Sequence, residues 1–177
     1  MVEIVRIGLN GTDYYGDPDD YNSMMGLFAL KIPMWRFTLQ GQIFAGENLG
    51  GIQAGCAQTV LYHNWENGYV RGNGVRTVGG FIDLGYQMTE KWAFAIGWGC
   101  DNPVDSDVKG GETSDGYYGI LYNDRVYVDA FYQVMANFKI GVEYARLLTS
   151  YSDANHWGYG EGDYAANRIQ FSAFFDF

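Results

Sequence analysis

The sequence lacks a long hydrophobic run. An apolar stretch such as Met24 to Leu30 falls far short of the roughly 20 residues that a membrane-spanning helix requires. Mean hydropathy is slightly negative, at −0.19. Both features argue against a helical membrane protein. They leave a membrane β-barrel open, because only alternate residues of its strands face lipid.

Basic residues are also few. The 11 lysines and arginines are outnumbered by 21 acidic residues, which gives a formal net charge of −10 and an isoelectric point of about 4.4. A protein that binds nucleic acid needs a cationic surface to face the phosphates. The composition therefore predicts no nucleic-acid partner.

Cysteine is limited to Cys56 and Cys100. Both fall at or beyond the predicted outer ends of strands. A disulfide would be compatible with an oxidising compartment, but sequence does not reveal the geometry that it requires. Two small unpaired residues at loop ends explain these positions equally well, so both interpretations stay open.

A secretory signal is missing from the start of the chain. The first residues, MVEIVRIGLNG, contain no basic segment, hydrophobic segment or cleavage site, and they alternate like a strand. An exported protein with this sequence has either lost its leader or is a piece of a longer chain. We favour the second explanation.

Aromatic residues and glycine are abundant, at 18% and 25 residues, and this composition favours strands. Alternation of apolar and polar residues predicts about eight strands in one domain spanning residues 1–177. Short turns are expected at Pro33-Met34, Thr89-Glu90 and Ala136-Asn137. The long connections are 12–22, 47–75, 102–123 and 149–166. The expected strands are 3–11, 23–32, 34–46, 76–87, 91–101, 124–135, 137–148 and 167–177.

Short and long connections that alternate in this way are typical of an up-and-down transmembrane barrel. The predicted fold is therefore an all-β, antiparallel up-and-down transmembrane β-barrel. It is either complete with about eight strands or the C-terminal half of a larger barrel. A soluble β-domain is the alternative, and it has no reason to segregate its loops by length.

Charged strand residues share one face of each predicted strand, except Arg146 near the predicted upper rim. In a wide barrel they would line water and bias which solutes pass. In a narrow barrel they would form a buried ion-pair network. Small inward residues (Gly79, Gly85, Ala93, Ala95, Gly97 and Gly99) favour the wide barrel. The predicted pore-lining residues are Arg36, Gln40, Gln42, Asp83, Arg125, Asp129, Lys139, Glu143 and Arg168.

Aromatic residues gather on the apolar face near the strand ends, where a membrane interface favours them. Those beside the short turns are Trp35, Tyr86, Trp92, Phe138 and Phe177, and those near the other end are Trp98 and Tyr144.

The last eleven residues, NRIQFSAFFDF, place Ile169, Phe171, Ala173, Phe175 and Phe177 on one face. This terminal segment resembles the insertion signal of bacterial outer-membrane barrels. WRFTLQGQIFAGENLGGIQAG (Trp35 to Gly55) and VYVDAFYQVMANFKIGVEYARLLTSYSD (Val126 to Asp153) resemble porin-like outer-membrane β-barrels of Gram-negative bacteria. Porins of this kind have about 16 strands, roughly twice the number expected here.

The resemblance implies an outer-membrane channel for passive diffusion of small hydrophilic solutes. Its implied partners are outer-membrane lipid and lipopolysaccharide, and the barrel-assembly machinery through the strand that ends at Phe177. Trimers are common in such families, although no residue here specifies one. The rival interpretation is a small non-conducting barrel of about eight strands with a structural or adhesion role through its external loops.

Other motifs carry little chemistry. Acidic loop clusters such as Asp101 to Asp107 have calcium-ligand chemistry, but ordinary solvated loop acid explains them better. His63 and His156 lie in predicted loops without a supported nucleophile. We therefore predict no enzyme, metal site or cofactor. The long loop 47–75 is expected to fold inward and narrow the pore.

Overall fold

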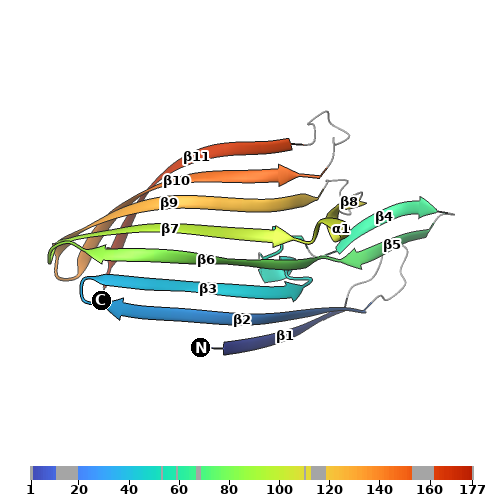
Figure 1. The fold of residues 1–177 in the computed structure, drawn as a ribbon, viewed down its shortest axis with the longest axis horizontal. Coiled ribbons are helices and arrows are strands. Elements are labelled where there is room, and N and C mark those ends of the chain that lie inside the picture. Colours follow the sequence, from blue (N-terminus) through green and yellow to red (C-terminus); the bar gives the residue numbers. More distant parts are fainter. Residues whose placement is uncertain are drawn as a thin grey trace.

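The computed structural model describes residues 2–10, 20–52, 54–58, 60–66, 69–109, 111–112, 119–152 and 162–176. Eight long strands form one antiparallel sheet in the order β1-β2-β3-β6-β7-β9-β10-β11 (Figure 1). Its members are β1 (Val2–Asn10), β2 (Asp20–Met34), β3 (Phe37–Glu47), β6 (Arg76–Gln87), β7 (Trp92–Pro103), β9 (Ile120–Met135), β10 (Phe138–Tyr151) and β11 (Gly162–Phe175).

The long connections carry small elements of their own at one end of this sheet. They are the 3₁₀ helix η1 (Gly50–Ile52), strands β4 (Val60–Glu66), β5 (Tyr69–Gly74) and β8 (Gly111–Glu112), and helix α1 (Asp105–Val108). β5, β4 and β8 form a second, three-stranded sheet. The expectation that 47–75 and 102–123 are loops throughout is therefore wrong. Short strands within them lack a long alternating pattern that would separate them from loop sequence.

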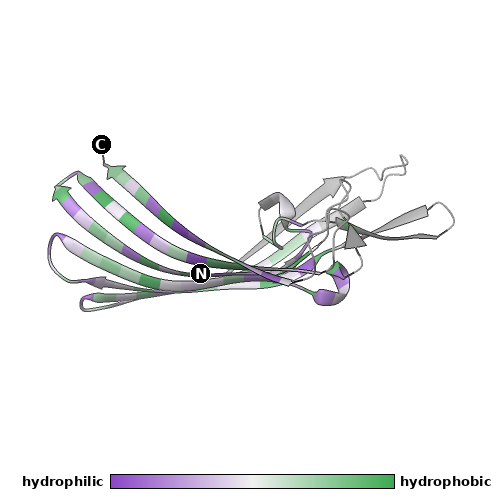
Figure 2. Cartoon of the chain, turned by 90° about the horizontal axis from the view of Figure 1, so that it is seen from above, coloured by the Kyte–Doolittle hydropathy of each residue, from purple (hydrophilic) through white to green (hydrophobic). Residues whose placement is uncertain are grey.

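The sheet confirms the predicted up-and-down antiparallel arrangement, because each long strand pairs with the next long strand along the chain. The sheet is not closed: β1 and β11 form its two edges, and no pairing between the described strands joins them. Figure 2 shows that the sheet bends along its length rather than lying flat.

One turn lies elsewhere than predicted. Pro33 continues β2 and pairs with Thr38, so the first short turn is formed by Trp35 and Arg36. β1 covers β2 only as far as Phe28, and Pro33 therefore lies where β2 is an edge that tolerates a missing N–H. Trp35 adopts the left-handed backbone of a tight turn, with φ 54°. The expected strand positions of Trp35 and Arg36 are therefore wrong.

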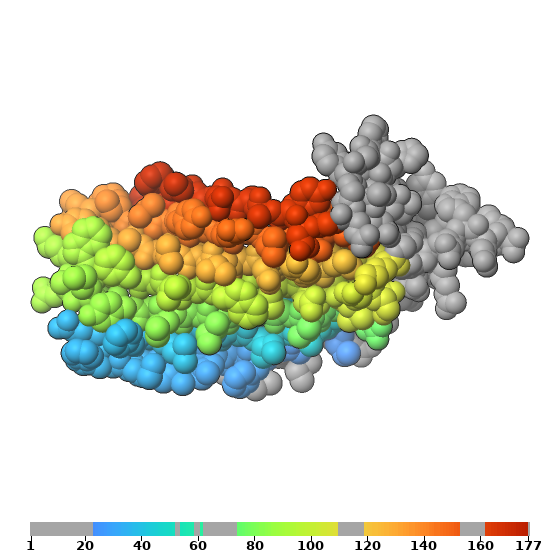
Figure 3. All heavy atoms as spheres, turned by 45° about the horizontal axis from the view of Figure 1, so that its top comes forward, coloured from blue at the N-terminus to red at the C-terminus, as the bar shows by residue number. Residues whose placement is uncertain are grey.

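Buried hydrophobic residues gather at the end of the sheet that carries the long connections. Leu61, Val75 and Val108 are fully buried and pack together with Leu121. Among the hydrophobic residues described within the eight-stranded sheet, only Ala145 and the terminal Pro103 are buried. The long strands thus form a single layer, and Figure 3 shows side chains open along one of its faces.

Candidate functional site

One face of the eight-stranded sheet, called the apolar face below, is a continuous apolar surface. One row across it, read from the strand pairing, is Ile32, Leu39, Leu84, Ile96, Val128, Tyr144 and Ile169. The neighbouring row is Met34, Phe37, Tyr86, Phe94, Ala130, Val142 and Phe171. Ile96 is 53% exposed and Phe171 is 81% exposed. Such a large uncovered apolar patch is uncommon on a soluble monomer and indicates a contact surface.

The apolar face has slanted boundaries. Phe37 begins β3 directly after its turn, and the pairing aligns it with Ala130 of β9. β9 continues from residue 130 to residue 135, so its turn lies five residues further along. At the other end, the first charged residue that projects from the apolar face is Glu47 on β3 and Arg146 on β10. Phe37 and Val142 share a row of the sheet. Glu47 lies ten residues beyond Phe37 (37 to 47), whereas Arg146 lies only four residues beyond Val142 (142 to 146).

Both boundaries therefore shift in the same direction, and the width of the band changes little. A shift of five residues over three strand spacings corresponds to an angle of about 45° between the strands and the line of turns, taking roughly 3.3 Å per residue and roughly 4.8 Å per strand. Strands of membrane barrels tilt by about 35–45°.

Aromatic side chains cluster on the apolar face beside the short turns. Tyr86 stacks on Phe37 with ring centroids 4.7 Å apart, and Trp92 lies 4.8 Å from Tyr132. The Phe138 ring lies 6.3 Å from Phe175. Other predicted interface aromatics are placed as follows: Trp98 and Tyr144 lie on the same face farther from these turns, Trp35 is 88% exposed in its turn, and Phe177 lies outside the described residues.

The opposite face, called the polar face below, carries eight of the nine predicted pore-lining residues. They are Gln40, Gln42, Asp83, Arg125, Asp129, Lys139, Glu143 and Arg168. Arg36 is the exception, because it lies in the first short turn, where its guanidinium donates to the Met88 carbonyl at 3.1 Å.

A belt of polar contacts crosses this face. Asp83 is 7% exposed and accepts hydrogen bonds from Gln40 Nε2 at 3.3 Å and from the Tyr127 hydroxyl at 3.1 Å. Tyr127 belongs to β9 and Asp83 to β6, so the tyrosine reaches over β7. It does so at Gly97, which has no side chain to obstruct the ring.

The belt continues through an ion cluster on β9, β10 and β11. Glu143 pairs with Arg125 and, at 2.8 Å, with Arg168. The carboxylate side chain is 17% exposed, and the two arginine side chains are 38% and 45% exposed. Asp129 lies directly opposite Glu143 on the same face, so two arginines and two carboxylates share this cluster.

Three aromatic rings of the polar face lie over glycines of neighbouring strands. Phe44 covers Gly79, Tyr127 covers Gly97 and Phe131 covers Gly141. Each ring and its glycine are direct partners in the strand pairing, which are Phe44–Gly79, Tyr127–Gly97 and Phe131–Gly141. Sequence reasoning recognised the small residues but missed these pairs. An inward aromatic opposite an inward glycine was the available signal.

The described part of residues 48–58, called the strap below, folds over the polar face at the end with the long connections. The Ser23 hydroxyl donates to the Asn48 carbonyl at 2.8 Å. Asp101 accepts a hydrogen bond from the Cys56 amide at 2.6 Å and another from the Thr77 hydroxyl at 2.8 Å. Because Ser23 and Asp101 project from the polar face, their bonds to Asn48 and Cys56 fix the strap on that face, and Thr77 holds the Asp101 carboxylate.

The strap has an unusual backbone. Asn48, Cys56 and Ala57 have φ values of 56°, 54° and 61°, and Gly55 has 66°. A non-glycine residue in this region is uncommon and persists where its surroundings hold it in place. The Gln58 amide group supplies part of that support, since it both donates to the Ile120 carbonyl and accepts from the Ile120 amide, each at 2.8 Å.

Both cysteines are free thiols. Cys56 is buried in the strap over the polar face, whereas Cys100 projects from the apolar face, so the sheet separates them. Burial, together with the negative charge of Asp101, raises the pKa of the Cys56 thiol to about 12.

Comparison with models of known protein families, with curated proteins and with solved structures found no match to this chain. No described helix is long and apolar enough to cross a membrane. Across the described ranges, no three His, Cys, Asp or Glu side chains gather closely enough to hold a metal ion. The side chains of His63 and His156 lie outside the described part.

Proposed function

We propose that this chain forms a wall of an outer-membrane β-barrel channel through which small hydrophilic solutes diffuse passively. The apolar face contacts lipid and the polar face contacts water. The observation that carries this proposal is a single-layer sheet whose uncovered apolar face has slanted, parallel boundaries. The apolar stretch on β3, from residue 37 to residue 45, has the length of a strand that crosses a tilted path through a bilayer.

Lipid is the cover that best fits the apolar face. A fully buried large apolar side chain contributes about 1.5–3 kcal/mol relative to exposure in water. The face offers many such side chains, and the described chain supplies no second layer for them. Aromatic rings at its edge, such as Tyr86, Trp92 and Phe138, match the residue types that favour a membrane interface.

A water-filled passage fits the polar face. The rings of Phe44, Tyr127 and Phe131 lean over glycines of the neighbouring strands and so take up less of the space in front of the sheet than rings that project straight from it. The sheet also ends in two unjoined edges. Both features favour a wall of a wide barrel over a narrow barrel filled by its own side chains.

The outer membrane, its lipid and lipopolysaccharide, the barrel-assembly machinery and a trimeric state belong to the same proposal. Strand β11 supports them, because it alternates Ile169, Phe171, Ala173 and Phe175 on one face. Phe177, through which the assembly machinery would bind, lies outside the described residues.

The decisive experiment is reconstitution of the full-length product that contains this chain into planar lipid bilayers. We expect discrete conductance steps, with an ion selectivity that changes in Arg125→Ala and in Lys139→Ala. Arg146→Ala is the matched control, because Arg146 lies on β10 but on the apolar face. Unchanged selectivity in both test variants would remove these side chains from the pore lining. A folded, lipid-inserted protein without conductance would favour the small non-conducting barrel.

The strap supplies the constriction in this proposal. It is fixed to the polar face at Ser23 and Asp101, where it projects into the passage. Deletion of residues 49–57 should raise the single-channel conductance. An unchanged conductance in the deletion variant would count against this role.

A further inference from the structure

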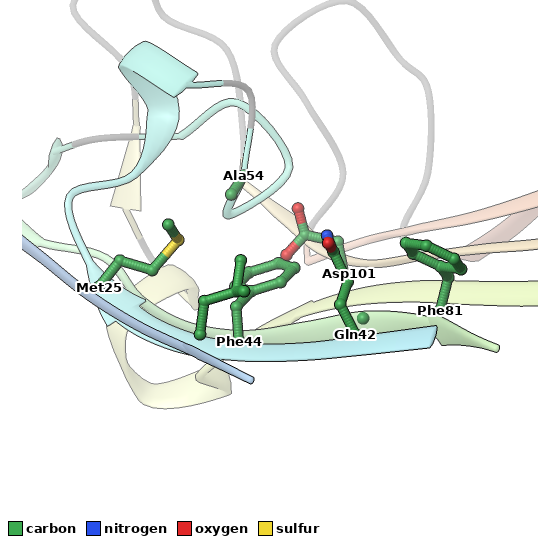
Figure 4. A pocket seen from close by; sticks show the side chains of 8 residues that line it. Met25, Gln42, Phe44, Ala54, Phe81 and Asp101 are labelled. Carbon is green, nitrogen blue, oxygen red and sulfur yellow. The ribbon is translucent and has the colours of Figure 1, made fainter. Parts of the chain in front are cut away.

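The polar face is not polar everywhere. Beneath the strap, four apolar side chains of β2, β3 and β6 face the same way as the polar belt: Met25, Leu27, Phe44 and Phe81. Together with Ala54 of the strap they line a hollow of about 380 Å³ (Figure 4). Its volume is within the range of small-molecule sites. A passage for hydrophilic solutes alone does not call for such a surface.

Two polar side chains, Gln42 and Asp101, border this hollow. Both carboxylate oxygens of Asp101 are already engaged, one by the Thr77 hydroxyl and the other by the Cys56 amide. Within the described chain, the side-chain amide of Gln42 makes no hydrogen bond, and it therefore retains its capacity to donate to a ligand oxygen.

A cationic residue, Arg125, lies in the same row of the sheet as Gln42 and Phe81. The strand pairing aligns Gln42 with Phe81, Phe81 with Gly99, and Gly99 with Arg125. Two strand spacings, about 10 Å, therefore separate the backbones at Phe81 and Arg125. Gly99, which lies between them, adds no side chain of its own, and the Arg125 guanidinium lies over the Tyr127 ring, 4.6 Å from its centroid.

Arg125 has an unused donor. Its Nη2 pairs with Glu143, but its Nε is buried and has no hydrogen-bond partner among the described residues. Glu143 is shared with Arg168, so one carboxylate serves two guanidinium groups. The Arg125 side chain is nevertheless 38% exposed, so a carboxylate can approach its guanidinium from the water side.

We propose that this hollow binds small organic carboxylates that carry an apolar body. The apolar body packs on Phe44 and Phe81, the Gln42 amide donates to an oxygen, and the carboxylate reaches Arg125. The inference rests on the proposed channel function and names a solute class for it. It goes beyond general diffusion, because a purely apolar solute lacks the anion and an inorganic anion lacks the apolar body.

The test measures equilibrium binding of benzoate to the full chain folded in detergent, by calorimetry or by ligand-observed magnetic resonance. Benzyl alcohol and anilinium are the comparison probes, since they keep the ring but remove or reverse the charge. We expect benzoate to bind at least tenfold more tightly than either probe. Arg125→Gln and Phe81→Ala should each weaken benzoate binding by about fivefold or more.

Two variants serve as matched controls. Arg146→Gln removes an arginine from the apolar face, and Phe131→Ala removes an aromatic ring from the polar face away from the hollow. Neither should change benzoate affinity. If Arg125→Gln fails to fold, Phe81→Ala still tests the site, because Phe81 belongs to no ion pair.

Parallel conductance measurements separate this inference from the channel proposal. Chloride conductance without preferential benzoate binding would overturn the inference and leave the channel proposal standing. Benzoate binding that depends on Arg125 and Phe81, without any conductance, would support the site and overturn the channel. Equal binding of benzoate and anilinium would overturn the assigned charge recognition.

Discussion

Gly97 contributes to the stability of the sheet because the Tyr127 ring lies over it. A side chain there would bring its first carbon within 3.0 Å of three atoms of Tyr127, so the ring would have to move. We expect Gly97→Ala to lower the free energy of unfolding by about 1–3 kcal/mol, the usual cost of overpacking. Chemical denaturation in lipid vesicles measures this change.

Gly85→Ala is the matched control for that experiment. Gly85 also lies on the polar face, but the nearest atom to an added carbon is the Thr38 carbonyl oxygen at 3.7 Å. The free energy of unfolding of the Gly85→Ala variant should change by less than about 0.5 kcal/mol. Equal destabilisation by the two variants would show that the Tyr127 ring does not depend on Gly97.

The Cys56 thiol should react slowly with alkylating reagents. Its pKa is raised to about 12 by burial and by Asp101, whereas only the thiolate is the nucleophile. In a Cys100→Ser background at pH 8, we expect iodoacetamide to modify the folded protein about a thousandfold more slowly than the unfolded chain. Mass spectrometry measures both rates.

The pH dependence of this reaction has a definite sign. The rate for the folded protein should rise about tenfold per pH unit without levelling off below pH 11. Asp101→Asn should raise the rate, because it removes a negative charge that opposes ionisation. Between pH 9 and about 12 the folded state keeps a proton that the unfolded chain has lost, so stability should fall as pH rises. A plateau near pH 9 would contradict the assigned burial.

Sequence alone predicted the face of most strand residues but few contacts between them. Asp83, Arg125 and Glu143 were predicted to share a face because side chains alternate along a strand. The bond from Tyr127 to Asp83 was not predicted, because it depends on a glycine in the strand between them. Arg36 was misplaced because the turn lies two residues later than the proline suggested.

At the scale of elements, one carboxylate anchors the middle of the strap to the sheet. Asp101 holds the Cys56 amide and the Thr77 hydroxyl at the same time. A hydrogen bond to a charged group contributes about 1.5–3 kcal/mol. We therefore expect Asp101→Ala to speed hydrogen exchange at the Cys56 amide by roughly 10- to 100-fold.

Asp105→Ala is the control for the strap prediction. Asp105 is an exposed acid whose described side-chain contact is an ion pair with Lys109. Exchange at the Cys56 amide should not change in this variant. Fast exchange at that amide in the unaltered protein would contradict the anchoring of the strap by Asp101.

Elements with a regular period were predictable, and elements without one were not. All eight long strands were identified from alternation, although most of them extend further into the long connections than predicted. β11, for example, begins at Gly162 rather than at residue 167. The strap and strands β4, β5 and β8 were read as loop, since they depend on contacts from distant segments such as the bond between Gln58 and Ile120.

At the scale of the whole molecule, the proposed function depends on whether lipid covers the apolar face. Ile96 and Ala95 are neighbours on β7 that project from opposite faces near the middle of the sheet. An apolar face in lipid penalises a charge there by roughly 2–4 kcal/mol, whereas a polar face in water accepts it. We expect Ile96→Lys to lose about that much stability in lipid vesicles, and Ala95→Lys to lose little. The contrast between adjacent positions separates contact with lipid from a general effect of the charge, because strand, length and composition are unchanged. Urea unfolding in vesicles measures both variants. Equal losses, or a folded protein in buffer without lipid or detergent, would mean that something other than lipid covers this face.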